Sequence, residues 1–570
     1  MLKVPYGVSG FESIREDGYE YIDKTRYIEK IEKERYCMYV RPRRFGKTLF
    51  TTMLDAYYAI DKKDKFEKLF RRLYIYDNPT KNKNNYYIMN FNFSGMLVDN
   101  SMELQDIEIS FNELVRTYLE QFIERYKLDI VMEKTNSAAQ MLRNCLSKFQ
   151  GLHLSNNIYI IIDEYDHFTN GLLEGSCEKF LNILGKAGFV RAFYEVIKAY
   201  TDYNVVERFF VTGVAPLTLD SMTSGFNITT SLTLNQEYVD MTGLNETEVR
   251  NLVNQVESNS EKQEEIYKEL KENYDGYIFS PENLQHIFNP TLVMYYLDNY
   301  IKLGVKPRDV IDKNLATNAE KLRNLIQMVN KKQNYEIIEE LMLEGKIEGK
   351  ILQSFELDKK FGREDFLSML FFNGYITIKS YDDLSTVTTF TIPNYISKKL
   401  YAEYMLSLVQ EDKRYEMSST KLEIAIAKFA RQGDIVDTIE YIKEFLMYCS
   451  VRDRENFNET NLKHIIQWLF AFSRAYFVYS EYPSLQGFSD LFVKNADASR
   501  DLYQAVIELK YIPKKDGTKE NIKRVQKEAR EQMKEYLKDE RLSAEHKLKA
   551  YAITFVGFEN YYLEEIELEK

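Results

Sequence analysis

Residues 41–48 constrain this chain more than any other segment, because they place a strand, a loop and a helix in one short stretch. Their sequence is Arg-Pro-Arg-Arg-Phe-Gly-Lys-Thr; an apolar run over 36–40 precedes them, and a helical pattern follows. This order predicts a phosphate-binding loop at the positive end of a helix dipole. Gly46 would let the backbone approach phosphates, Lys47 would reach the β- and γ-phosphates, and Thr48 would bind Mg²⁺. We therefore expect ATP and Mg²⁺ to bind here.

One position departs from the usual loop pattern G-x-x-x-x-G-K-[ST]. Arg41 stands where the first glycine is expected, and Pro42 follows it. Glycine is usual there because it adopts a positive φ at little cost, so we expect this loop to follow a different backbone path. The guanidinium groups of Arg41, Arg43 and Arg44 are expected to add phosphate contacts. Phe45 belongs to the same predicted nucleotide-binding loop.

A second apolar run ends in acidic residues. Residues 158–162 read Ile-Tyr-Ile-Ile-Ile, and Asp163 and Glu164 follow them. A carboxylate at the C-terminal end of a buried parallel strand lies on the ligand edge of the sheet. We expect Asp163 beside the Mg²⁺ held by Thr48, and Glu164 to orient and deprotonate the attacking water. The plainer alternative is a core strand that runs into an acidic loop.

A third apolar run covers residues 208–214 and reads Arg-Phe-Phe-Val-Thr-Gly-Val. Its polar residue, Thr212, comes near the end of the expected strand, where it would sense the γ-phosphate. An ordinary core strand would give the same pattern, so both interpretations remain open.

Several blocks of the sequence resemble, in order, those of the AAA-ATPase-like family of prokaryotic proteins. In that family the Arg-Pro-Arg-Arg-Phe-Gly-Lys loop is the usual form, which implies that the missing glycine is a family trait. The resemblance covers about residues 1 to 400 and implies a nucleotide-binding module, often joined to a C-terminal nuclease-like domain, without implying a substrate. The blocks are residues 5–14, 21–25, 41–48, 92–94, 163–166 and 211–214, with 274–277 and 289–290 similar to later family motifs.

Two apolar segments near the C-terminus carry charged residues at a recognisable spacing. Asp490 lies in the first segment, and Glu508 and Lys510 lie in the second. Strand residues i and i+2 face the same side, so Glu508 and Lys510 would lie together. Asp490 and Glu508 could then share a Mg²⁺ ion, and Lys510 could steady the attacking hydroxide. This pattern resembles the PD-(D/E)xK nuclease core.

Neighbouring segments agree with that resemblance. A helix is expected over 461–472, Gln532 lies on a later helix, and a strand is expected over 550–557, which restores an αβββαβ order. In the family the first helix often supplies another acid, and Glu459 is the nearest match here. The plainer alternative is a charged face of an edge strand. Domains of this type can also keep the core and lose cleavage.

The length of 570 residues suggests three or more domains of an α/β protein. A helix and a hairpin between residues 365 and 392 have the order of a winged helix, for which we favour a lid over a DNA-binding role. Residues 407–419 are the best linker candidate. We expect a P-loop NTPase-like parallel sheet over 1–240, a helical lid with a winged-helix-like part over 241–405, a helical linker over 406–450, and a restriction-endonuclease-like α/β domain over 451–570.

Composition excludes several classes of protein. The formal net charge of −12 argues against a protein that coats nucleic acid through bulk charge. No apolar run is long enough to span a bilayer and no signal peptide is visible, so we expect a cytoplasmic protein without a membrane partner. The cysteines form no C-x-x-C pair, so neither a disulfide framework nor a zinc site is expected. They are Cys37, Cys145, Cys177 and Cys449.

Two functions remain open at this point. The first is an ATPase coupled to a Mg²⁺-dependent nuclease that acts on nucleic acid, which requires active Glu164, Glu508 and Lys510. The second is a nucleotide-dependent switch with an inactive nuclease-like binding domain and a protein partner or second copy of the chain. Residues 510–549 contain 13 Lys and Arg against 8 Asp and Glu. Such a segment could guide a phosphodiester, and a solvated amphipathic helix explains it equally well.

Overall fold

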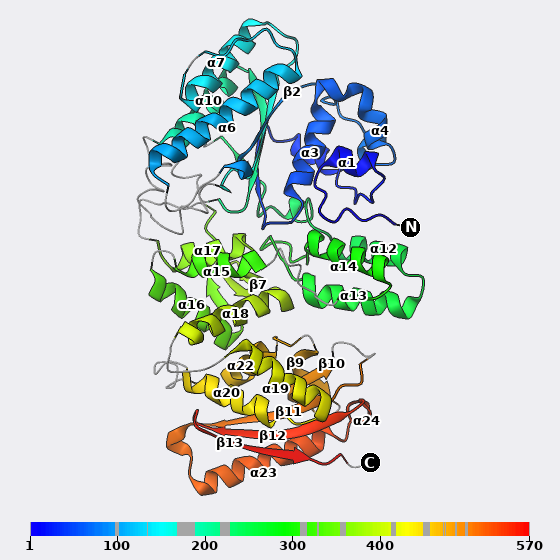
Figure 1. Cartoon of the computed structure of the whole chain (residues 1–570), viewed down its shortest axis with the longest axis vertical. Coiled ribbons are helices and arrows are strands. Elements are labelled where there is room, and N and C mark those ends of the chain that lie inside the picture. The colour runs from blue at the N-terminus through cyan, green and yellow to red at the C-terminus, as the bar shows by residue number, and fades with distance from the viewer. Residues whose placement is uncertain are drawn as a thin grey trace. The chain divides into compact units, whose positions relative to one another are not determined.

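The structure is a computed structural model, and it divides the chain into two compact units (Figure 1). Met1–Tyr335 and Glu348–Asn394 form the first unit, and Glu336–Ile347 and Tyr395–Lys570 form the second. The finer four-part division expected from the sequence stays a prediction. The structure describes residues 2–96, 102–133, 135–167, 188–216, 228–307, 316–327, 330–353, 361–411, 418–448, 457–470, 472–473, 475–484, 487–495 and 500–568.

A five-stranded, wholly parallel sheet forms the core of the first unit, as the sequence predicted. Strand β3 is buried along its whole length, which explains its unbroken apolar sequence. Because all strands are parallel, their carboxyl ends meet at one edge, and the loops after β1 and β3 lie at that edge. In spatial order the strands are β2 (Tyr87–Asn92), β3 (Ile158–Asp163), β4 (Val206–Gly213), β1 (Tyr36–Val40) and β5 (Thr230–Ser231).

Helices cover both faces of this sheet, so its strands are buried on two sides (Figure 1). One group packs around the helix that follows the phosphate-binding loop, and the other group packs on the opposite face. The first group is α3 (Lys47–Tyr58), α1 (Phe11–Glu16) and α4 (Phe66–Phe70), and the second is α6 (Leu104–Arg125), α7 (Ala138–Gly151) and α10 (Phe189–Asp202).

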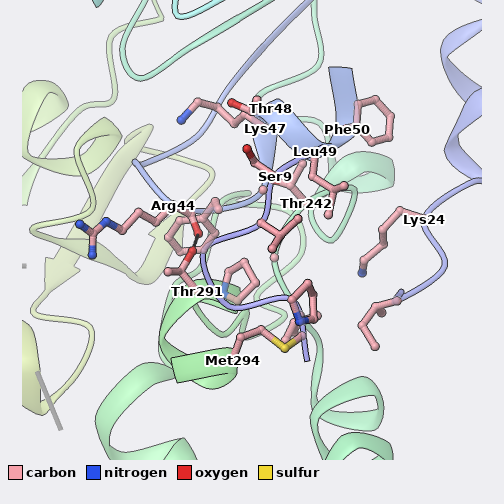
Figure 2. A pocket seen from close by; sticks show the side chains of 18 of the residues that line it. Ser9, Lys24, Arg44, Lys47, Thr48, Leu49, Phe50, Thr242, Thr291 and Met294 are labelled. Atoms are coloured by element: carbon pink, nitrogen blue, oxygen red, sulfur yellow. Dashed lines mark hydrogen bonds between the residues drawn. The ribbon is translucent and has the colours of Figure 1, made fainter. Parts of the chain in front are cut away.

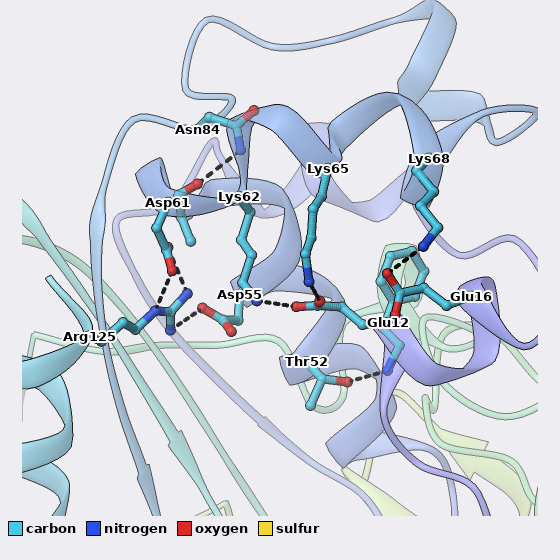
Figure 3. Close-up of polar contacts among 12 residues, drawn as sticks. Glu12, Glu16, Thr52, Asp55, Asp61, Lys62, Lys65, Lys68, Asn84 and Arg125 are labelled. Atoms are coloured by element: carbon cyan, nitrogen blue, oxygen red, sulfur yellow. Dashed lines mark hydrogen bonds and ion pairs between the residues drawn. The ribbon is translucent and has the colours of Figure 1, made fainter.

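Helix α1 is fixed against α3 by apolar burial and by polar contacts at its start (Figure 3). Phe11 is fully buried, and its backbone N–H donates to Thr52 Oγ1 at 3.1 Å. Glu12 accepts hydrogen bonds from Lys62 and, at 2.7 Å, from Lys65. Such exposed ion pairs contribute about 1 kcal/mol or less each, so the burial of Phe11 dominates. The chain segment before α1 is thereby held beside the N-terminus of α3.

Arg125 of α6 joins three elements through its guanidinium group (Figure 3). It donates to Asp55 of α3 at 2.9 Å and makes two hydrogen bonds of 2.9 Å to Asp61. Asp61 lies in the short helix η1 (Ile60–Lys65) that follows α3. A bidentate Arg–carboxylate pair fixes geometry as well as charge, so the C-terminal end of α3 is held in one orientation.

The rest of the first unit contains helices and a small three-stranded sheet. Asn245 and Glu248 form a complete capping box at the start of α12. The helix and hairpin expected between residues 365 and 392 are also present. The elements are α12 (Glu246–Val256), α13 (Ser260–Tyr274), α14 (Pro290–Leu303), α15 (Ala316–Gln327), α16 (Lys331–Glu344, which crosses into the second unit), β6 (Ile347–Gly349), α17 (Arg363–Phe372), β7 (Thr377–Asp382) and β8 (Val387–Thr391).

Helix α17 is a core helix. Every side chain from Phe366 to Phe372 is buried, so the helix has no free face to place in a DNA groove. The turn after it contacts the phosphate-binding loop, because a Cβ added to Gly374 would lie 3.0 Å from the Pro42 ring. The lid interpretation of the winged-helix-like part stays a prediction.

The second unit is built on a five-stranded mixed sheet. Strands β9, β10 and β11 are antiparallel, β12 is parallel to β11, and β13 is antiparallel to β12. Helices α22 and α23 lie on opposite sides of this sheet (Figure 1). The predicted αβββαβ order is therefore confirmed, with β13 added. The elements are α22 (Glu459–Phe470), β9 (Tyr476–Ser484), β10 (Gly487–Asn495), β11 (Gln504–Ile512), α23 (Lys519–Tyr536), β12 (Leu548–Val556) and β13 (Asn560–Ile566).

Helices α18 (Tyr395–Glu411), α19 (Ser419–Gln432) and α20 (Val436–Tyr448) precede this sheet. The predicted linker over 407–419 therefore begins inside a helix, and its residues 412–417 lie outside the described residues.

The thiols of Cys37 and Cys145 are free and buried, whereas Cys177 and Cys449 lie outside the described residues. Burial raises the pKa of each described thiol to about 12, so both groups are neutral at physiological pH. In the described parts of the chain, no helix combines the length and the apolar sequence needed to cross a bilayer.

Candidate functional site

The phosphate-binding loop has the predicted strand, loop and helix, and its backbone follows an unusual path. Gly46 adopts φ 86° immediately before α3, a region that favours glycine. Arg44 also has a positive φ of 68°, although it carries a side chain. Arg44 and Gly46 therefore both lie in the left-handed region just before the helix begins. The first glycine of the common pattern is absent from this loop.

Lys47 is the first residue of α3 and is buried inside its own loop. Its ammonium group donates to the backbone oxygens of Arg41 at 3.0 Å and Pro42 at 3.1 Å. Only 5% of its surface is exposed. Carbonyl oxygens hold the ammonium where a phosphate oxygen could replace them, so the loop fits a nucleotide phosphate group.

Thr48 and Asp163 meet at the carboxyl edge of the sheet. Thr48 Oγ1 donates to Asp163 Oδ2 at 2.7 Å, and the N–H of Glu164 donates to Asp163 Oδ1 at 3.0 Å. Burial raises the pKa of Asp163, and the Thr48 hydroxyl opposes this shift. A hydroxyl and a carboxylate are ligands that suit Mg²⁺. The pair therefore fits the predicted ion.

Glu164 follows with a positive φ of 53°, which turns the chain sharply after β3. Its carboxylate lies 4.0 Å from His167 Nδ1. Burial lowers the pKa of His167, and the charge of Arg43 lowers it further although Glu164 opposes both. His167 is therefore mainly neutral at physiological pH. Glu164 lines the same cavity as Lys47 and Thr48, so it is placed to act on a ligand there.

Asp166 is fully buried and ties β3 to the end of β4. It accepts hydrogen bonds from the backbone of Val214 at 3.0 Å and Ala215 at 2.8 Å. Burial and the charge of Glu164 raise the pKa of Asp166 to about 6. A Cβ on Gly213 would lie 2.3 Å from its carboxylate, so this position requires glycine. Asp166 thus has a structural role at the site.

Thr212 pairs with Tyr39 across β4 and β1, and its side chain is fully buried. Within the part of the chain that the structure describes, its hydroxyl has no hydrogen-bond partner. The hydroxyl does not line the cavity, and its proposed role as a γ-phosphate sensor stays a prediction.

A cavity of about 380 Å³ opens beside the loop (Figure 2). One end carries Gly46, Lys47, Thr48 and Glu164, which suit phosphates. The other end is mostly apolar and suits a flat base. It is lined by Pro5, Tyr6, Val8, Met241, Leu244, Pro290 and Met294.

Sequence analysis missed the apolar end of this cavity. Residues 5–14 and 289–290 matched family blocks, but their apolar side chains carry no spacing that indicates a ligand. Lys24 also lines the cavity, and Glu248 of α12 holds its ammonium at 2.7 Å. The cavity therefore combines the N-terminal segment, the loop, the segment before α12 and the start of α14.

The structure corrects the prediction that Arg41 contacts phosphates. Its side chain is 1% exposed, and its guanidinium lies 4.3 Å from the ring of Tyr39 and 4.2 Å from that of Phe279. Burial lowers its pKa. The group is enclosed in the core because three backbone oxygens accept its hydrogen bonds. They belong to Thr233 at 2.8 Å, Val40 at 3.0 Å and Tyr238 at 3.3 Å.

Phe45 and Arg44 belong to the same loop and both line the cavity. Phe45 lines the cavity but is 1% exposed, and its ring packs edge-on against Tyr277 and Phe279. The Arg44 side chain runs away from Lys47 and Thr48 (Figure 2), and its backbone oxygen accepts a hydrogen bond from Thr291 at 2.9 Å. The Phe45 ring therefore anchors the loop by packing, and the phosphate contact predicted for Arg44 stays a prediction. The role predicted for Arg43 stays untested.

In the second unit, β10 and β11 bring the predicted carboxylates together. Leu491 pairs with Ile507, and the same register places Asp490 opposite Glu508. Directly opposed residues of antiparallel strands share one face of a sheet. Burial and the negative charge of Asp490 raise the pKa of Glu508.

Lys510 lies beside the same pair, as the i and i+2 spacing predicted. Its ammonium is 2.6 Å from Glu508 and 3.7 Å from Glu459 on α22. Burial lowers the pKa of Lys510, but Glu508, Glu459 and Asp490 together raise it above its ordinary value, so the ammonium stays charged. Glu459, the nearest match to the family's additional acid, is therefore at the site.

Glu508 is 2% exposed, and burial together with Asp490 raises its pKa to about 7. Its Oε2 atom is buried and has no hydrogen-bond partner among the residues that the structure describes. An ion at this point would satisfy it, so the site fits a divalent cation. Burial and the charges of Glu508 and Asp490 raise the pKa of Tyr536 on α23. Gln532 lies one turn before Tyr536 on that helix.

Sequence analysis also missed Lys463. Its ammonium lies 2.8 Å from Asp490 Oδ1, while the backbone N–H of Leu509 donates to Asp490 Oδ2 at 2.9 Å. The only available signal was helical spacing, because Lys463 follows Glu459 by one turn of α22. Across the described ranges, no group of three or more His, Cys, Asp or Glu residues is arranged to hold a metal.

The first unit has the fold and loop of a P-loop nucleotide-binding protein, and the second has the sheet and charged edge of a restriction-type nuclease domain. Comparison with protein families agrees with both assignments. Residues 5–223 match the AAA-ATPase-like family, described as predicted AAA-ATPase, and residues 457–565 match the PD-(D/E)XK nuclease superfamily. The chain therefore contains an AAA-ATPase-like domain over residues 5–223 and a PD-(D/E)XK nuclease superfamily domain over residues 457–565.

A curated relative comes from Azotobacter chroococcum mcd 1, where it is described as an uncharacterized protein in the vnfD 5′ region. It is 27% identical over 253 residues. The match covers 43% of this chain and 44% of the relative, so it spans less than half of either protein.

Proposed function

We propose that this protein binds and hydrolyses ATP and that its C-terminal domain cleaves nucleic acid in a Mg²⁺-dependent reaction. The observation that carries the first part is the contact between Thr48 and Asp163 beside the buried ammonium of Lys47. These three groups combine phosphate binding and ion binding at one end of a cavity that has an apolar opposite end. The proposed site of action is the cytoplasm, which the buried free thiols of Cys37 and Cys145 support.

Each group at the ATP site has a separate task in this proposal. The Lys47 ammonium would exchange the carbonyl oxygens of its own loop for phosphate oxygens. Thr48 and Asp163 would hold Mg²⁺, which supplies positive charge to the transferring phosphate group. Glu164 would accept the proton of the attacking water, because its carboxylate follows the metal-side Asp163 directly.

The nuclease proposal rests on Asp490 and Glu508, which face each other across two strands. The buried and unpaired Oε2 of Glu508 supports its assignment as a ligand of Mg²⁺, with Asp490 as the other. Lys510 would orient the attacking hydroxide and stabilise the charge that develops on the phosphate. The basic residues between 510 and 549 supply positive charge for a phosphodiester backbone.

One observation favours the second candidate function, a nucleotide-dependent switch with an inactive nuclease-like domain. Asp490 and Glu508 are each paired with an ammonium group, from Lys463 and Lys510 respectively. This arrangement neutralises both carboxylates without a metal, so the domain could bind a protein partner or a second copy of the chain instead of cleaving nucleic acid.

Cleavage assays on single- and double-stranded DNA and RNA, with and without Mg²⁺ and ATP, distinguish the two functions. We expect Mg²⁺-dependent products from the wild type and none from Lys510→Ala. The Lys47→Ala variant should lose ATP hydrolysis and any ATP dependence of cleavage. Hydrolysis of ATP without cleavage of any substrate would support the switch and overturn the nuclease assignment.

A further inference from the structure

The candidate nuclease site contains an ammonium group for which the proposed reaction has no use. Lys463 projects from α22, and its Nζ lies 2.8 Å from Asp490 Oδ1. Both side chains are 13% exposed, so water screens this pair only weakly. The other oxygen, Asp490 Oδ2, is already held by the backbone N–H of Leu509. Asp490 therefore has both oxygens occupied in this structure.

The charges around the site explain why Lys463 is held there. Three carboxylates, of Glu459, Asp490 and Glu508, face two ammonium groups, of Lys463 and Lys510. Lys510 contacts Glu508 and Glu459, so the ammonium of Lys463 is the partner of Asp490. Two buried carboxylates on facing strands would repel each other without such neutralisation.

A divalent cation shared by Asp490 and Glu508 must use oxygens that this arrangement occupies. Glu508 offers its unpaired Oε2, but the Oδ1 atom of Asp490 is paired with Lys463. The backbone N–H at Oδ2 cannot move without breaking the β10–β11 pairing, whereas a lysine side chain can rotate. The cation and Lys463 therefore compete for one atom.

We propose that Lys463 is a built-in counter-ion of Asp490 that divalent cations must displace, so that it sets the cation concentration at which the site fills. The inference rests on the proposed metal-dependent function of the same site. Lys463 acts through Asp490 and is a positioning residue. Removing its ammonium should raise the affinity for the cation, while removing Asp490 should abolish binding.

The test measures Mn²⁺ binding to the full-length protein without nucleotide. Binding is monitored by the loss of the paramagnetic resonance signal of free Mn²⁺. All proteins carry Asp163→Asn, which removes the other candidate ion site. We expect Lys463→Met to bind Mn²⁺ about tenfold more tightly than its parent, the scale of one charge-assisted hydrogen bond. Lys463→Arg, which keeps the positive charge, should resemble the parent, and Asp490→Asn should not bind.

A matched control separates this effect from a general loss of positive charge. Lys428→Met removes a lysine of the same unit that is ion-paired with Asp434 at 2.6 Å and lies on α19, outside the site. It should leave the Mn²⁺ affinity unchanged. Circular dichroism checks that each variant is folded.

Equal or weaker Mn²⁺ binding by Lys463→Met would overturn the inference. If Asp490→Asn still abolished binding in that case, the metal site of the proposed function would stand. If neither the parent nor Lys463→Met bound Mn²⁺, the inference and the proposed metal-dependent function would fail together.

Discussion

Thr48 Oγ1 donates a hydrogen bond to Asp163 Oδ2 at 2.7 Å, although 115 residues separate the two positions. The contact exists because β1 and β3 run in the same direction, so their carboxyl ends reach the same edge of the sheet. Strand β4 lies between them, and the helix that starts at Lys47 brings Thr48 across to Asp163. The two residues predicted to bind one ion are thus adjacent.

Lys47→Ala should remove most of the affinity for ATP. Lys47 is 5% exposed and its ammonium is held by carbonyl oxygens of its own loop, so its loss removes the charge nearest the phosphate end of the cavity. We expect affinity to fall about a hundredfold, measured by calorimetric titration with Mg²⁺ present. Lys65→Ala is the control, because Lys65 pairs with Glu12 outside the cavity. Equal affinities of Lys47→Ala and the wild type would show that the site is elsewhere.

Glu164→Gln should keep ATP binding and slow hydrolysis by about a hundredfold or more, the scale of losing a general base. Glutamine preserves the size of the side chain but cannot accept a proton. Phosphate release under single-turnover conditions measures the chemical step separately from product release. An unchanged rate would exclude Glu164 as the base.

The sequence predicted the elements of both sites because their signals are local. A strand followed by Gly-Lys-Thr, and an apolar strand followed by Asp-Glu, each define a ligand edge within a few residues. The direction in which a side chain points depends on residues that are distant in the sequence, and this is why the prediction for Arg41 was wrong. Tyr39, Phe279 and the oxygen of Thr233 enclose its guanidinium, and two of them come from distant parts of the chain.

Arg41→Met should therefore destabilise the protein and affect ATP binding only indirectly. The substitution leaves three buried carbonyl oxygens without the donor that they now share, which costs about 3 kcal/mol. Urea unfolding of the full-length protein measures this loss. Arg43→Met, at a half-buried position of the same loop, is the matched comparison and should be close to the wild type in stability. An Arg41→Met protein with unchanged stability and lost ATP binding would restore the phosphate-contact hypothesis.

In the second unit, too, local patterns predicted some site residues and missed those that depend on contacts between distant segments. The spacing of Glu508 and Lys510 predicted a shared strand face, and the register of β10 and β11 places the predicted Asp490 opposite Glu508. Lys463 could not be found in this way, because its partner lies on a strand and its own position gives only a helical spacing. The apolar end of the cavity was missed for a similar reason, since it is assembled from three separate segments of the chain.

Divalent-cation binding at the second site should depend on pH through Glu508. Burial and Asp490 raise its pKa to about 7, so the carboxyl is mainly protonated at pH 6 and mainly ionised at pH 8. Affinity for Mn²⁺ should rise about tenfold per pH unit below 7 and level off above it. Glu508→Gln should bind weakly at every pH.

The raised pKa of Glu508 has the opposite effect on the free energy of unfolding, which falls as the pH rises. Its folded pKa lies above the ordinary value of 4.5, so this contribution of Glu508 to the free energy of unfolding is complete below pH 4.5. It is lost as the pH rises through 7.

A Mn²⁺ affinity that is flat between pH 6 and pH 8 would contradict the assignment of Glu508 as a metal ligand.

Asp490→Ala, Glu508→Ala and Lys510→Ala should each abolish Mg²⁺-dependent cleavage and leave ATP binding intact. The two carboxylates face each other across β10 and β11, and Lys510 lies 2.6 Å from Glu508, so all three act on the same phosphate. Groups that serve a single step give non-additive losses, and the triple variant should be scarcely slower than any single one. Cleavage rates under single-turnover conditions, with ATP affinity measured on the same samples, test both statements. Losses that multiply across the three variants would show that the residues act in separate steps, and unimpaired cleavage by any one of them would remove that residue from the site.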